Sequence, residues 1–335
     1  MAADPAGHDP TLIRQGEWFY DFTTGVDAPR SYLPIRRSQD LVRWEPVGAV
    51  FTLPPAWVVR DLGVLPSDFW APDVSYFDGR YHVYYAASLY ATNNSVIGLA
   101  TNATLDPSDP AYEWVDEGVV LRSVPGVDSF NAIDPDVVLD EDGAPWLSYG
   151  SFWTGLELRR LDPSTGKPPT GDRSVHPLAG RPPPGAIEAP SIQRHGRFYY
   201  LFASFDRCCI GVDSDYRLVV GRSERVSGPY VDRAGIAMEL GGGTEILRGH
   251  GRYAGTGHSD VYRDGDTDLL IHHYYDREDG GLPKLSVREV DWSGGWPELG
   301  APLSERRGAG YGGVRWNANG LASWRAYATP LPTAR

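Results

Sequence analysis

The sequence predicts an all-β protein, a five-bladed β-propeller, and a repeated motif is the main reason. Five segments share an anchor residue, then Pro (Ser in the fifth), an aliphatic residue two places later, a glycine turn and an apolar strand. The anchors are Asp9, Ala71, Asp134, Ala189 and His258, so they lie 62, 63, 55 and 69 residues apart. Repeats of this length that hold several short strands are typical of propeller blades.

Each repeat predicts a strand pair, because an alternating or apolar run stands on either side of the glycine turn. The predicted pairs cover residues 8–22, 71–88, 134–151, 189–204 and 258–274. Their turns contain Gly16, Gly79, Gly143, Gly196 and Gly265. No helical periodicity competes with this pattern, so we expect an all-β fold.

Composition agrees with many turns and short strands in one large domain. The chain has 335 residues, with 39 Gly, 28 Pro, 11 Trp and 19 Tyr. A chain of this length suits two average domains or one large all-β domain. The Pro- and Gly-rich stretch at 165–185 is interpreted as a connection, since the repeat resumes after it. We therefore expect a propeller over 1–300 and a C-terminal extension over 301–335.

Charge limits the classes of partner. The chain carries 44 acidic and 31 basic residues, a net charge of −13. Such a protein repels phosphate backbones and anionic lipids, so nucleic acid and membranes are not expected partners. No run of 18 apolar residues marks a membrane span. We expect a monomer that acts on a neutral substrate without an organic cofactor.

The anchors point to a site on the propeller axis. The first strand of each blade lines the central channel, so residues at equivalent positions converge there. Asp9, Asp134 and His258 are anchors, and Glu188 directly precedes the fourth anchor. Neighbouring buried carboxylates raise one another's pKa, which yields one protonated acid and one ionised base, as glycoside hydrolysis requires. An Asp before Pro is often only a turn residue, but the shared register favours a ring of functional groups.

Aromatic and polar residues near the anchors are candidates for sugar binding. Trp70, Phe152 and Trp153 can offer flat apolar faces to sugar rings, although propeller cores also contain many aromatics. Asn131 and Ser151 flank the third repeat and can hydrogen-bond hydroxyl groups, or they can be turn residues. His8, beside the first anchor, completes the predicted substrate-binding set.

The two cysteines of the chain, Cys208 and Cys209, are adjacent. Two cysteines make no disulfide framework, and this spacing is not a zinc motif. The sequence leaves open whether they are inert thiols or, under oxidising conditions, a disulfide between neighbours.

At these residues the sequence resembles the family 43 glycoside hydrolases, and within them the endo-arabinanase branch. The matching segments run in order from residue 8 to about 275, over most of the chain. They are "HDPTLI", "SQDLVRWEPVG", "FWAPDVSYFDGRYHVYYAAS", "NAIDPDVVLDEDGAPWLSYGSFWTGL", "IEAPSIQRHGRFYYLFASFDRCC", "VGRSERVSGPYVDRAG" and "GTGHSDVY". The resemblance implies a five-bladed propeller that hydrolyses α-1,5-linked L-arabinofuranose in arabinan with inversion.

The resemblance also implies residue roles. Asp9 of "HDP" is similar to the general base, Glu188 of "IEAP" to the general acid, and Asp134 of "AIDP" to the residue that tunes the acid and orients the sugar. His258 of "GTGH" resembles the histidine that faces a channel ion, commonly calcium, although relatives usually carry Pro-Gly-His here. Inversion would separate the carboxyl groups of Asp9 and Glu188 by roughly 6.5–9.5 Å.

Two other functions stay open at this point. An exo-acting α-L-arabinofuranosidase or β-xylosidase would use the same acids and differ in its loops. A non-catalytic carbohydrate-binding propeller would not need three acids in register. Because polymeric arabinan cannot enter a cell, we expect an extracellular protein, although this chain shows no export signal and an intracellular enzyme for imported oligosaccharides is an alternative.

Overall fold

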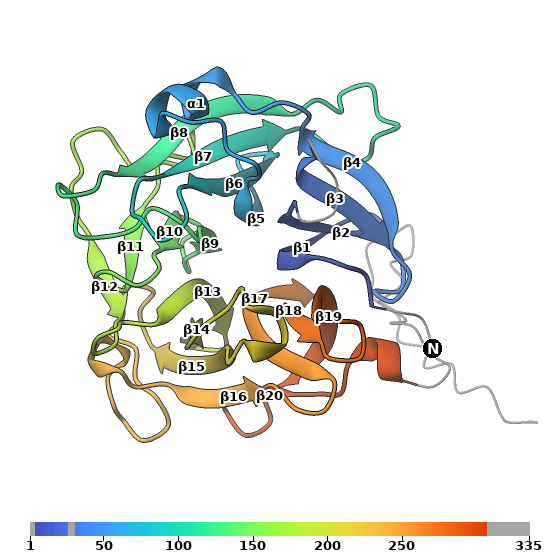
Figure 1. The fold of residues 1–335 in the computed structure, drawn as a ribbon, viewed down its shortest axis with the longest axis vertical. Coiled ribbons are helices and arrows are strands. Elements are labelled where there is room, and N and C mark those ends of the chain that lie inside the picture. The colour runs from blue at the N-terminus through green and yellow to red at the C-terminus, as the bar shows by residue number, and fades with distance from the viewer. Residues whose placement is uncertain (1–3, 26–30, 307–335) are drawn as a thin grey trace, which may run out of the picture.

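The computed structural model describes residues 4–25 and 31–306, which form five four-stranded antiparallel sheets around a central axis (Figure 1). Each sheet takes its four strands in chain order, from the axis outward. This arrangement confirms the predicted five-bladed β-propeller. Within the described part of the chain, no helix is long and apolar enough to cross a membrane.

The first two blades contain the repeats anchored at Asp9 and Ala71. The first blade consists of β1 (His8–Gln15), β2 (Trp18–Thr24), β3 (Tyr32–Ser38) and β4 (Glu45–Phe51). The second consists of β5 (Trp70–Phe77), β6 (Arg80–Ser88), β7 (Ser95–Asn102) and β8 (Val115–Ser123). The helix α1 (Ala56–Leu62), which the repeat did not predict, joins them and buries Val58 and Leu62.

The other three blades follow the remaining anchors. The third consists of β9 (Asp136–Leu139), β10 (Pro145–Tyr149), β11 (Leu156–Arg160) and β12 (His176–Ala179). The fourth consists of β13 (Ile187–His195), β14 (Phe198–Phe205), β15 (Arg217–Ser223) and β16 (Thr244–Arg248). The fifth consists of β17 (Tyr253–Asp264), β18 (Thr267–Asp276), β19 (Leu282–Asp291) and β20 (Glu298–Leu299).

Three short 3₁₀ helices lie in the connections and at the end of the described chain. They are η1 (Gly211–Asp213), η2 (Met238–Leu240) and η3 (Leu303–Glu305). Leu303 of η3 is buried in a cluster with Leu12 and Leu269 of the first and fifth blades. The predicted C-terminal extension therefore begins on the propeller, and its residues from 307 onward lie outside the described part.

The hydrophobic core lies mainly between neighbouring blades. One cluster joins the first two blades through Phe22, Phe69 and Tyr85, whose side chains are fully buried. A similar cluster joins the third and fourth blades through residues such as Leu158 and Leu201. Burial of each such side chain stabilises the fold by about 1.5–3 kcal/mol, so the blades depend on their neighbours for stability.

A ring of hydrogen bonds also links the blades close to the axis. The residue two places after an anchor carries a side-chain oxygen. This oxygen accepts a hydrogen bond from an amide N–H in the first strand of the following blade. The donors and acceptors are Leu12 to Asp260 (2.7 Å), Val74 to Thr11 (3.2 Å), Val137 to Asp73 (3.2 Å) and Ile192 to Asp136 (3.0 Å). Asp260 belongs to the last blade and Leu12 to the first, so one of these four bonds joins the two ends of the propeller.

The N-terminal segment closes the propeller at its outer side. Ala6 pairs with Lys284 of β19, and two backbone hydrogen bonds flank this bridge. The N–H of Gly7 donates to the carbonyl of Pro283 at 3.0 Å, and the N–H of Leu285 donates to that of Pro5 at 2.9 Å. The chain before β1 is therefore fixed to the fifth blade and positions the first anchor.

Candidate active site

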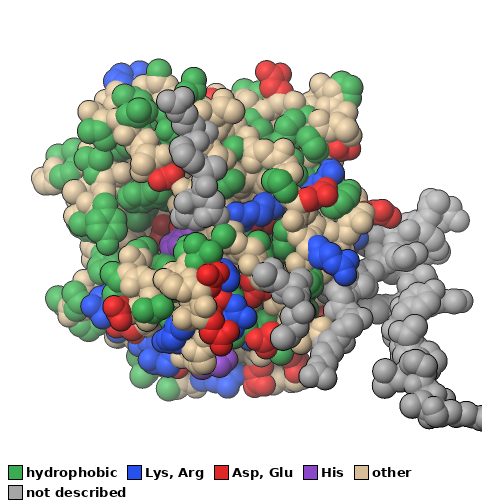
Figure 2. Space-filling view, turned by 45° about the vertical axis from the view of Figure 1, so that its right-hand side comes forward, with side chains coloured by type: hydrophobic (Ala, Val, Ile, Leu, Met, Phe, Trp, Pro, Cys, Tyr) green, Lys and Arg blue, Asp and Glu red, His purple; other side chains and the backbone are tan. Residues whose placement is uncertain are grey.

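One large cavity opens at the end of the channel where the anchors meet. Its volume is about 1640 Å³, larger than the 300–1,000 Å³ of most small-molecule sites. Figure 2 shows hydrophobic side chains around this hollow, with a histidine and acidic groups visible inside it. All ten predicted site residues line the cavity: His8, Asp9, Trp70, Asn131, Asp134, Ser151, Phe152, Trp153, Glu188 and His258.

The five anchors share a backbone conformation, and three of them, Asp9, Asp134 and His258, line this cavity. All five have a left-handed φ between +45° and +55°, which costs a non-glycine residue about 1–3 kcal/mol. In four blades the register of the first two strands also shifts at or next to the anchor, so the strand bulges there. β-Bulges redirect side chains, and here the repeated bulge turns the anchors toward the axis. Strain repeated at equivalent positions is typical of functional sites.

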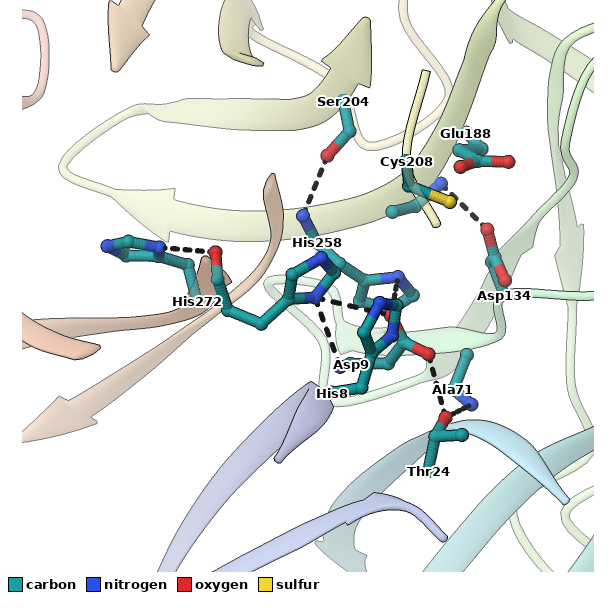
Figure 3. Close-up of polar contacts among 12 residues, drawn as sticks. His8, Asp9, Thr24, Ala71, Asp134, Glu188, Ser204, Cys208, His258 and His272 are labelled. Atoms are coloured by element: carbon teal, nitrogen blue, oxygen red, sulfur yellow. Dashed lines mark hydrogen bonds and ion pairs between the residues drawn. The ribbon is translucent and has the colours of Figure 1, made fainter. Parts of the chain in front are cut away.

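Asp9 lies among three imidazole rings (Figure 3). Its Oδ1 is 2.7 Å from Nδ1 of His8, 3.1 Å from Nδ1 of His258 and 3.4 Å from Nδ1 of His273. Its Oδ2 accepts a hydrogen bond of 2.7 Å from the hydroxyl of Thr24. Burial by itself raises the pKa of Asp9, but the imidazoles of His8 and His258, together with the hydrogen bond from His258, hold it well below its usual value. Asp9 is therefore ionised at neutral pH.

Glu188 has the opposite electrostatic character. It is buried, and this burial raises the pKa of its carboxyl group above the usual value, with the charge of Asp9 acting in the same direction. Two hydroxyl groups oppose the shift: Ser151 donates to Oε2 at 2.7 Å and Tyr216 donates to Oε1 at 2.8 Å. The site thus combines a carboxylate that stays ionised with a carboxyl group that favours its proton, the combination that acid–base catalysis uses.

Asp134 connects the two acids. Burial raises its pKa to about 8, and the charges of Glu188 and Asp9 add to this effect while His258 opposes it. Its Oδ2 accepts the amide N–H of Ala189, the residue after Glu188, at 3.0 Å. Asp134 is thereby fixed to the same strand as Glu188, and its protonation depends on that of its neighbours.

His258 faces Asp9, and no metal is needed to explain its position. Its amide N–H donates to the hydroxyl of Ser204 at 2.9 Å. Burial lowers its pKa, but the carboxylate of Asp9 and its hydrogen bond outweigh this and raise the value to about 9. A protonated His258 is thus an ion-pair partner of Asp9. Coordination of an ion by Nε2 would require His258 to give up this proton, because a protonated imidazole has no free lone pair.

Two groups among the described residues have ligand atoms close enough to one another for a metal ion. One combines His8, Asp9 and His273, and the other consists of Asp73, Asp136 and Asp260 of the hydrogen-bonded ring. His258 belongs to neither group. The calcium predicted beside it stays a prediction, which would require water for most of its oxygen ligands.

Several residues at the site were missed by the sequence analysis. Thr24 and His273 contact Asp9, and Tyr216 contacts Glu188. They lie on β2, on β18 and directly before β15, where the repeat offers no shared register. Tyr90 and Leu65 also line the cavity and are strongly exposed. In the sequence, His272 and His273 stand inside an otherwise apolar strand, which is a signal that could have identified His273.

The adjacent cysteines form a disulfide, which settles the question that the sequence left open. Both residues line the cavity, next to Ile210.

Comparison with known proteins places the chain in a family. Residues 5–297 match the model for glycosyl hydrolases family 43. The extracellular endo-α-(1→5)-L-arabinanase 1 of Bacillus subtilis is 40% identical over 87% of this chain and 86% of its own length. The extracellular exo-α-(1→5)-L-arabinofuranosidase ArbA of Cellvibrio japonicus is 39% identical over the same shares.

A solved structure agrees with this assignment. The α-L-arabinanase of Cellvibrio cellulosa in complex with arabinohexaose superimposes with a TM-score of 0.85 at 38% identity, covering 89% of this chain and 96% of the other. The resemblance inferred from the sequence motifs is therefore confirmed. On its fold, its cavity and these similarities, the chain belongs to family 43 of the glycosyl hydrolases.

Proposed function

We propose that this protein is an endo-acting arabinanase that hydrolyses α-1,5-linked L-arabinofuranose within arabinan, with inversion. The observation that carries the proposal is that Asp9, whose pKa is held below its usual value, and Glu188, whose pKa is raised by burial, line one cavity. The names of the similar proteins supply the substrate class, since these relatives are arabinanases and an arabinofuranosidase. The relatives that are named extracellular support action outside the cell.

In the proposed reaction, Asp9 accepts a proton from a water molecule that attacks the anomeric carbon. The bond from that carbon to O5 of the next sugar breaks, and Glu188 gives its proton to the leaving oxygen. Asp134 orients the sugar and adjusts the proton affinity of Glu188. After one turnover Asp9 is protonated and Glu188 is ionised, so exchange with solvent restores both. The separation of 6.5–9.5 Å between the two carboxyl groups remains a prediction of this scheme.

The cavity residues supply substrate binding in this proposal. Trp153 is half-exposed on the cavity rim and offers an indole face to a sugar ring. The backbone of its loop adopts a left-handed conformation at Phe152 and Trp153, with φ values of +54° and +33°. Ser151 holds Glu188, and the amide oxygen of Asn131 accepts a hydrogen bond of 2.7 Å from Ser95. A calcium ion at His258, if bound, would add positive charge that favours ionised carboxylates.

The direct test replaces Glu188 by glutamine. Glu188→Gln keeps the shape of the side chain but removes the acidic proton, so turnover of linear arabinan should fall by about 10²–10⁴-fold. The matched control is Glu157→Gln on β11, a residue that bonds Tyr149 and Thr154 and does not line the cavity. It should retain turnover. Near-normal activity of Glu188→Gln would remove the proposed acid.

Separation of products by size distinguishes endo from exo action. A ladder of arabino-oligosaccharides early in the reaction supports the endo assignment. Arabinose or one short product from the first time point would favour the exo alternative, for which a relative of nearly equal identity exists.

A further inference from the structure

The disulfide-bonded turn contacts the site through a tyrosine outside the cavity. Cys208 and Cys209 are joined, and Cys209 has a left-handed φ of +69°. Its amide N–H donates a hydrogen bond of 2.8 Å to the phenol oxygen of Tyr275 on β18. Tyr275 is buried and is not among the residues that line the cavity. The disulfide-bonded turn thus fixes the position of the Tyr275 oxygen.

The same oxygen reaches the histidine beside Asp9. Oη of Tyr275 lies 2.6 Å from Nε2 of His8, and Nδ1 of His8 lies 2.7 Å from Oδ1 of Asp9. The amide of Cys209 can only donate, and the hydroxyl of Ser214, which accepts the amide N–H of Ile210, also donates to the Tyr275 oxygen. The phenol therefore accepts from both, and its own proton is left to point to His8. A neutral imidazole that accepts at Nε2 carries its proton on Nδ1. That proton then faces Asp9.

Packing holds the His8 ring in this orientation. The ring stacks on His273 with centroids 3.7 Å apart and an interplanar angle of 24°. His273 is fully buried, and its Nδ1 accepts the amide N–H of Asp9 at 3.2 Å. Rotation of His8 would break both the stacking and the bond to Tyr275.

We propose that Tyr275, held by the disulfide-bonded turn at Cys208 and Cys209, is a positioning residue that keeps the Nδ1–H of His8 directed at Asp9. The inference rests on the proposed function, in which Asp9 is the general base. Without the Tyr275 hydroxyl, His8 can carry its proton on Nε2 and present a lone pair to Asp9. The carboxylate would then turn away from the direction in which it accepts the proton of the attacking water.

Tyr275→Phe tests the hydroxyl alone. We expect kcat on linear arabinan to fall by about 10- to 100-fold, because displacement of a catalytic group by an ångström costs that much. KM should change by less than about twofold, since Tyr275 does not line the cavity. The matched control is Tyr230→Phe, which should keep its kcat. This variant loses a buried hydrogen bond of 2.9 Å to the carbonyl of Val226, and Tyr230 does not line the cavity.

The disulfide provides a second, independent measurement. Dithiothreitol, or the double substitution Cys208→Ser and Cys209→Ser, should lower kcat of the otherwise wild-type enzyme severalfold while circular dichroism shows an intact fold. In Tyr275→Phe the same treatment should lower kcat little further, because the hydroxyl that connects Cys209 to His8 is already absent. An equal loss in both backgrounds, or no loss in the wild type, would overturn the proposal. Should Tyr275→Phe not fold, an unchanged kcat of the wild-type enzyme after reduction would still overturn the proposal.

Asp9→Asn separates failure of this inference from failure of the proposed function. An active Asp9→Asn enzyme would contradict the base assignment and the positioning role together. An inactive Asp9→Asn beside a Tyr275→Phe enzyme with normal kcat would leave the base assignment intact and refute only the role of Tyr275.

Discussion

Asp9 and Glu188 are both buried carboxyl groups, yet their surroundings give them opposite protonation preferences. One oxygen of Asp9 faces the imidazoles of His8 and His258, and His258 is protonated, whereas Glu188 is contacted by two neutral hydroxyl groups. Positive charge favours an ionised acid, and burial without charge compensation favours a protonated one. The division of labour in the proposed reaction thus follows from which residues surround each acid.

Ser151→Ala should change the pH profile in a defined direction. The Ser151 hydroxyl stabilises ionised Glu188 and so lowers its pKa. Its removal should raise that pKa and move the alkaline limb of kcat/KM upward by up to about one pH unit, the equivalent of one hydrogen bond. The acidic limb, which reports Asp9, should stay in place.

The control for this measurement lies in the same loop. Thr154→Ala also loses a hydroxyl-to-carboxylate hydrogen bond, to Glu157 at 3.0 Å, but outside the catalytic cavity. Its pH profile should match that of the wild type. An alkaline limb that stays fixed or moves downward in Ser151→Ala would show that Ser151 does not tune the acid.

At the scale of the strand, the sequence repeat predicted the site only where residues share a register. The five anchors occupy equivalent positions with the same left-handed backbone, so alignment of the motifs identified Asp9, Asp134 and His258. Thr24 and His273 reach the same acid from second strands, where each blade has a different side chain. Contacts of that kind depend on how the blades pack, which a repeat pattern does not encode.

The helix α1 illustrates another limit of sequence reading. Pro55 precedes it and Gly63 ends it with a φ of +76°, which are ordinary helix boundary signals. With seven residues, it is too short for a clear 3.6-residue periodicity. The same pattern therefore fits a loop equally well.

The hydrogen-bonded ring near the axis makes a prediction about stability. Asp136 accepts bonds from Ile192 and Ser148, but burial and the charge of Asp260 raise its pKa to about 7. A carboxyl group whose folded pKa exceeds its unfolded value of about 3.9 destabilises the fold when ionised. Its contribution to the free energy of unfolding should therefore fall as pH rises from about 4 to about 7 and stay low above that.

Asp136→Asn should remove this penalty while the amide oxygen still accepts both bonds. The thermal midpoint of the variant minus that of the wild type should be larger at pH 8 than at pH 5. Asp136→Ala should instead cost about 1–3 kcal/mol, because it leaves a buried amide N–H unpaired. The exposed Asp142→Asn, in the next turn of the chain, should show no such pH trend. A pH-independent Asp136→Asn difference would contradict the assignment.

On the scale of the whole molecule, the propeller depends on closure between its first and last blades. The N-terminal segment forms two backbone hydrogen bonds to β19, and Asp4 accepts one from Tyr274 at 2.8 Å. Deletion of residues 1–7 should lower the free energy of unfolding by about 3 kcal/mol, at about 1 kcal/mol per bond. Chemical denaturation measures this.

A smaller change provides the comparison for the deletion. Tyr274→Phe loses only the bond to Asp4 and should cost about a third as much. Equal stability of the truncated and intact proteins would show that the direct contacts between the first and fifth blades, which include the inner hydrogen bonds and the apolar cluster around Leu12 and Leu269, close the propeller without the N-terminal segment.

The central claim is that Asp9 and Glu188 act as base and acid on opposite sides of the scissile bond, with water as the nucleophile. The measurement that tests it most directly is ¹H NMR of the first reducing end released from linear arabinan, before mutarotation. Direct attack by water predicts the β-anomer first. Initial release of the α-anomer would mean retention through a covalent intermediate, and it would contradict the role assigned here to Asp9.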